Sequence, residues 1–80
     1  MAAGDHPGVV SIPGICGGEV CIERTRIPVW ILYRLKQLGM TDPDLLEDYP
    51  DLTQHDLDCA WKYVAAHQSE IDQAVRRNGN

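Results

Sequence analysis

The fold of this 80-residue chain depends mainly on residues 28–64, PVWILYRLKQLGMTDPDLLEDYPDLTQHDLDCAWKYV. The stretch contains three segments whose apolar residues recur at helical spacing, separated by turns of only a few residues. The third segment has the cleanest pattern, with apolar residues at i, i+3, i+4 and i+7. These are Leu57, Ala60, Trp61 and Val64. We therefore expect a mainly α domain, a three-helix bundle of the helix-turn-helix kind, with helices over residues 28–38, 41–49 and 53–68.

Local signals mark where these helices begin and end. Pro28 suits a first helical turn, where its missing N–H costs nothing. Gly39 suits a left-handed cap at the end of the first helix. Thr41 and Thr53 are each followed three residues later by an aspartate, a variant of the capping box that begins a helix.

The segments that flank this stretch are less regular. Ile71 and Val75 continue the helical pattern, so residues 69–77 either prolong the last helix or form another after a break capped by Ser69. Before the helices, residues 9–23 form two short β-type runs around a Pro/Gly-rich link, which predicts a β-hairpin or β-arm. Residues 1–8 and 78–80 are expected to be flexible ends of this single domain, which spans residues 9–77.

A two-stranded hairpin is marginal in water and needs helices or a second copy to pack against. A chain of this length also stabilises only a small core. We therefore expect a homodimer formed through the β-arm. The expected dimer contacts are Val10, Ile12, Val20 and Ile22.

The composition indicates a globular domain, with 44% hydrophobic and 24% charged residues. The longest apolar run, Ile27 to Tyr33, has seven residues, against the ~20 that a membrane helix needs. The N-terminal residues MAAGDHPG have neither the basic region nor the apolar core of a secretion signal. These features lead us to expect a cytoplasmic protein with no membrane partner.

No pattern of residues predicts catalysis, a metal site or a cofactor. A structural zinc site usually needs two closely spaced ligand pairs, and among the cysteines here only Cys16 and Cys21, separated by four residues, form such a pair. The thiols and imidazoles of the chain belong to Cys16, Cys21, Cys59, His6, His55 and His67. Most acids between residues 42 and 58 lie in expected first turns of helices, where capping explains them. We therefore expect a protein that is not an enzyme.

The charge is divided unevenly along the chain. The net charge is −5, yet residues 41–72 alone carry nine Asp and Glu side chains against a single lysine. The first 40 residues are mildly basic. This balance disfavours a protein that is held to nucleic acid mainly by phosphate contacts, and it suits a partner with a basic surface.

Five blocks of the sequence, in order, resemble a small prokaryotic family catalogued as domain of unknown function number 433. They are Gly17-Gly18 with the strand after it, Thr25-Arg26-Ile27-Pro28-Val29, Gly39-Met40, Leu45-Leu46-Glu47-Asp48-Tyr49-Pro50 and Leu52-Thr53. The resemblance implies a homeodomain-like helical part, an N-terminal β-arm and dimerisation. It also implies that the protein is a VapB-like antitoxin, of a kind that is often encoded beside a PIN-like ribonuclease. Arg24 departs from the family pattern, which usually has glycine there. If that glycine adopts a left-handed backbone conformation, an arginine at this position would disfavour the same turn.

The resemblance and the acidic segment favour an antitoxin that binds and neutralises a PIN-like ribonuclease toxin of a type II toxin–antitoxin pair. The expected toxin contacts are Asp56, Asp58, Glu70, Ile71 and Val75. The alternative is a helix-turn-helix DNA-binding regulator that acts on its own operon. Its expected phosphate and base contacts are Arg24, Arg26, Arg34, Lys36, Gln54 and His55. Two simpler interpretations stay open: Arg26 pairs with an acid of the fold, and the acidic residues form only a solvated face.

Overall fold

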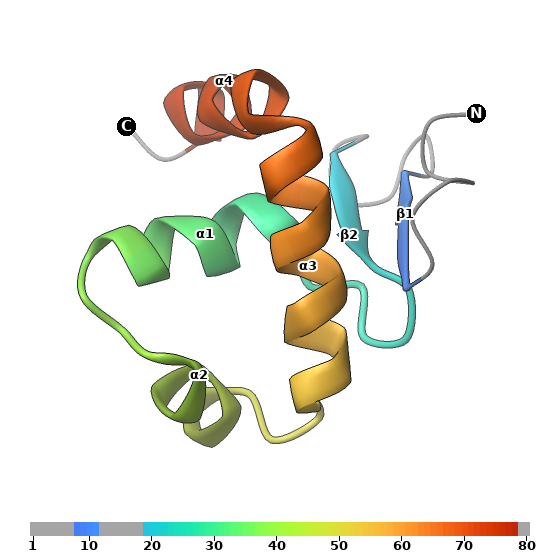
Figure 1. Cartoon of the computed structure of the whole chain (residues 1–80), viewed down its shortest axis with the longest axis vertical. Coiled ribbons are helices and arrows are strands. Elements are labelled where there is room, and N and C mark those ends of the chain that lie inside the picture. The colour runs from blue at the N-terminus through green and yellow to red at the C-terminus, as the bar shows by residue number, and fades with distance from the viewer. Residues whose placement is uncertain (1–7, 12–18, 79–80) are drawn as a thin grey trace.

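A short antiparallel hairpin precedes four helices in the computed structural model, which describes residues 8–11 and 19–78 (Figure 1). The strands are β1 (Val9–Ser11) and β2 (Val20–Ile22). The helices are α1 (Val29–Gln37), α2 (Asp42–Asp48), α3 (Gln54–Ala66) and α4 (Gln68–Asn78). The expected fold class, mainly α with an N-terminal hairpin, is confirmed. Of the ends expected to be flexible, residues 1–7 and 79–80 lie outside the described part, whereas Gly8 lies in a turn and Asn78 ends α4.

The hairpin is covered by helices of the same chain. Val9 pairs with Ile22 and Ser11 with Val20, and the far side of β2 bridges to Pro28 at the start of α1. The side chains of Val9, Val20 and Ile22 are buried in the common core. The hairpin therefore obtains within one chain the apolar cover that an isolated two-stranded sheet lacks.

The helix ends follow the expected signals closely. Thr41 and Thr53 each form a complete capping box, because the threonine hydroxyl accepts from a backbone N–H while the aspartate three residues later accepts from the threonine N–H. After α1, Gly39 has a φ of 106°, and the N–H groups of Gly39 and Met40 donate to the carbonyls of Lys36 and Leu35. These two bonds make a Schellman motif. Pro28 is the N-cap of α1 and so lies one residue before the helix.

The structure resolves the open question of the last helix. α3 ends at Ala66, and His67 leaves the helical conformation with φ −133° and ψ 44°. A separate helix, α4, begins at Gln68. There is thus a break, but Ser69 lies inside α4 and does not cap it.

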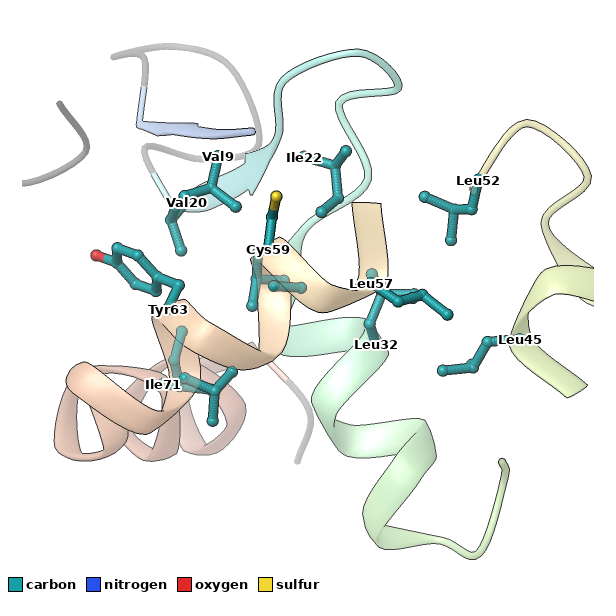
Figure 2. Packing of buried hydrophobic residues seen from close by; sticks show 13 residues of the cluster. Val9, Val20, Ile22, Leu32, Leu45, Leu52, Leu57, Cys59, Tyr63 and Ile71 are labelled. Carbon is teal, nitrogen blue, oxygen red and sulfur yellow. The ribbon is translucent and has the colours of Figure 1, made fainter. Parts of the chain in front are cut away.

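The core is organised around α3, which crosses the molecule between the other elements (Figure 1). Leu57 of α3 and Leu32 of α1 lie at its centre, with Leu45 of α2 beyond them at one end (Figure 2). At the other end Tyr63 of α3 lies beside the hairpin residue Val20, and Ile71 of α4 lies beyond Tyr63 (Figure 2). No helix in the described part of the chain is long and apolar enough to cross a membrane.

Candidate functional site

Arg24 and Asp56, assigned from sequence to different partners, bind each other. The Arg24 guanidinium donates through Nη2 to Asp56 Oδ2 at 2.9 Å and to the Asp51 carbonyl at 2.6 Å. Asp56 Oδ2 also accepts from the Thr53 N–H at 3.1 Å, and the residue is only 3% exposed. Burial opposes ionisation of Asp56, but the hydrogen bonds from Arg24 and Thr53 outweigh it and lower the pKa of this carboxyl. Both side chains fix the turn after β2 to the start of α3, which leaves Asp56 little surface for a toxin. The Arg24 side chain is still 57% exposed, so its expected phosphate contact stays a prediction.

The question raised by Arg24 at a usual glycine position is also answered. The left-handed backbone position in this turn is Arg26, with φ 61°, rather than Arg24. The turn is closed by hydrogen bonds from the Arg26 N–H to the Ile22 carbonyl at 2.7 Å and from the Ile22 N–H to the Ile27 carbonyl at 2.9 Å. A side chain at position 24 is therefore compatible with the turn.

A second centre forms around Asp42, the first residue of α2. Its Oδ1 accepts from Lys36 Nζ at 2.9 Å and from Trp61 Nε1 at 3.1 Å, and its Oδ2 accepts from Gln54 Nε2 at 2.9 Å. Lys36 Nζ also lies 4.6 Å from the centre of the Trp61 ring, a cation–π contact. Gln54 donates in addition to Asp58 Oδ1 at 3.1 Å. This centre joins α1, α2 and α3, so Lys36 and Gln54 are engaged by carboxylates of their own chain.

Three of the six side chains expected to contact nucleic acid are bound by other groups of the chain. Arg24, Lys36 and Gln54 are held as described. Arg34 is exposed on α1, Arg26 is exposed in the turn before it, and His55 is exposed on α3. His55 Nε2 lies 3.6 Å from Cys59 Sγ.

Residues of α4 that were expected to bind a toxin are partly committed to the fold. Ile71 is 1% exposed, which corrects its assignment as a toxin contact. Glu70 accepts from the Tyr63 hydroxyl at 2.7 Å, and burial together with this bond raises the pKa of Tyr63. Val75 is half-buried. At the end of α4, Arg77 Nη2 donates to Glu19 at 2.6 Å and fixes the helix to the residue before β2.

The residues expected at a dimer interface are also mostly internal. Val20 is 3% exposed and Ile22 is fully buried, so neither can reach a second copy, and their assignment as dimer contacts is corrected. Val10 is half-buried on β1. Ile12 lies outside the described residues.

The acidic residues divide into two groups with different roles. Asp42, Asp44 and Asp56 stabilise the fold as helix caps or hydrogen-bond centres. Four other acids are exposed at one end of the molecule, which is formed by α2, the link after it and the start of α3 (Figure 1). Within the described part of the chain, none of these four acids forms a salt bridge. We call these four the acidic end: Glu47, Asp48, Asp51 and Asp58.

Two members of the acidic end occupy positions that do not favour stability. Glu47 and Asp48 lie in the last turn of α2, which contains no basic residue. The C-terminus of a helix carries partial negative charge, so carboxylates there are repelled. N-terminal capping therefore does not account for these two acids. Their place at the end of a helix is already indicated in the sequence by Pro50, which follows two residues later.

Acidification should unfold the protein below about pH 4. The pKa values of Asp42, Asp44 and Asp56 are lowered in the folded chain. The unfolded chain then takes up protons first, so the stabilisation is complete above the ordinary aspartate pKa and is lost as the pH falls through the folded values. The urea midpoint, measured at several pH values, should fall steeply in acid, and in a D42N/D56N variant it should be lower at neutral pH and fall less steeply. An equally steep fall in the variant would contradict this assignment.

Among residues 8–11 and 19–78, no group of three or more His, Cys, Asp or Glu side chains is arranged to hold a metal ion. The arrangement that the structure does offer is a surface, the exposed carboxylates of the acidic end. Of the cations around it, Arg24 and Lys36 are paired with carboxylates of the same chain. Such a surface can bind a basic macromolecule.

Comparison with known proteins supports the fold and the sequence motifs. The chain is similar to a crystal structure described as a DUF433 member protein from Anabaena variabilis ATCC 29413, with a TM-score of 0.84 and 39% sequence identity. The similarity covers 94% of this chain and 74% of that chain. Comparison with curated proteins gave no significant match. A family model described as protein of unknown function (DUF433) matches residues 9–64, from β1 to α3. The chain therefore belongs to the DUF433 family.

Proposed function

We propose that this protein is an antitoxin-like interaction module whose acidic end binds and neutralises a PIN-like ribonuclease toxin. The observation that carries the proposal is the pair of carboxylates at the C-terminal end of α2, Glu47 and Asp48, which the fold does not need and which its helix dipole disfavours. Residues that oppose local stability are expected where they serve function.

The chemistry of such a partner matches this surface. A ribonuclease holds RNA through a cleft of Lys and Arg side chains, because phosphate is recognised by positive charge. Exposed carboxylates at the acidic end can replace phosphates in that cleft, and the attraction also accelerates encounter. Asp58 and Asp51 extend the negative surface from α2 to the start of α3.

The structure favours this proposal over DNA binding. A helix-turn-helix protein needs its recognition helix to approach phosphates, whereas α3 begins beside the exposed carboxylates of Asp51 and Asp58. Arg24 and Lys36, two of the expected phosphate contacts, are already paired with Asp56 and Asp42. DNA binding would require the backbone phosphates to compete with these carboxylates.

The E47Q/D48N variant should bind the ribonuclease about tenfold more weakly at low salt, because the lost charges lower the association rate. The partner to use is a PIN-like ribonuclease encoded beside the gene for this chain. Affinity and association rate are measured with the purified proteins, and toxicity is measured by growth after co-expression.

The matched control is E23Q/D72N, which removes the same amount of charge from exposed Glu23 and half-buried Asp72, away from α2. It should bind like the wild type. Thermal unfolding should show that E47Q/D48N is no less stable than the wild type, since it relieves repulsion at the helix end. Equal weakening by both variants would mean that only net charge matters, and no complex with the wild type would refute the proposal.

We further propose that the protein acts as a homodimer, through the outer edge of β1. The chain is short, its strands have three residues each, and Val10 is the one expected contact among the described residues that is not buried. V10D should convert the dimer to a monomer, because a carboxylate at a close-packed interface is costly to desolvate. Light scattering after gel filtration measures the mass, and a wild-type chain that is monomeric at all concentrations would exclude the dimer.

A further inference from the structure

We draw no further inference here: the strongest candidate, the outer face of α1, where Leu38 at the C-cap is 64% exposed and Ile31 lies outside the packed core cluster, carries nothing because no described residue or neighbouring molecule shows what covers it.

Discussion

Replacement of Asp56 by alanine should lower the free energy of unfolding by about 3 kcal/mol. The substitution removes a cap that bonds the Thr53 N–H, and it removes the carboxylate that binds Arg24. It also leaves a vacancy at a position that is 3% exposed. Because small domains are stabilised by only about 5–15 kcal/mol, this is a large fraction of the total. Urea unfolding followed by Trp fluorescence measures the loss.

Asp44 provides the matched control for this prediction. It is the third residue of a capping box in α2, as Asp56 is in α3, and its Oδ2 accepts from the Thr41 N–H at 3.0 Å. Asp44 differs in that it is exposed and forms no salt bridge with an arginine among the residues that the structure describes. D44A should therefore lose much less stability than D56A. Equal losses would mean that capping alone accounts for Asp56 and that the Arg24 contact contributes nothing.

Gly8→Ala should destabilise the protein by about 2–4 kcal/mol. Gly8 has a φ of 91°, in the region that residues with a Cβ rarely adopt. A Cβ at this position would lie 2.7 Å from Cys59 Sγ and 3.0 Å from Cys59 Cβ. The strand β1 would have to move away from α3, which would weaken the burial of Val9. Thermal and urea unfolding measure the change.

Two further variants separate the backbone cost from the steric cost. Gly39 also has a positive φ, 106°, but a Cβ there would meet nothing within 4 Å, so G39A reports the backbone cost alone. The loss in G8A should exceed the loss in G39A. In a C59A background the added cost of G8A should shrink towards that of G39A, because the sulfur is gone. A cost that is unchanged in this background would show that Gly8 is not packed against Cys59.

The helix boundaries could be predicted because their signals are local. A threonine and the aspartate three residues after it bond to each other's backbone whatever surrounds them, and Gly39 ends α1 through bonds within six residues. The break at His67 cannot be located from the sequence, because the apolar pattern runs through it from Val64 to Ile71. The stacking of the His67 ring on Tyr63 at 4.4 Å, and the packing of α4 on α1, depend on the folded chain.

The roles of the charged side chains could not be predicted in the same way. Arg24 and Asp56 are separated by 32 positions in the sequence, and Trp61 and Asp42 by 19. Whether a carboxylate also binds an arginine or stays an exposed surface charge depends on which distant groups the fold brings to it. The sequence marks Asp56 as a cap, but it does not show that Asp56 is buried and bound to Arg24 or that Glu47 stays exposed.

Local patterns in the sequence suffice to predict the short hairpin, the helices with their caps, the family motifs and the excess of acid in residues 41–72. Which of the charges remain available to a partner follows from the folded chain. Caps and apolar periodicity act within one or two helical turns, so they can be read from neighbouring residues. Pairing and burial of charge depend instead on contacts between segments that lie far apart in the chain.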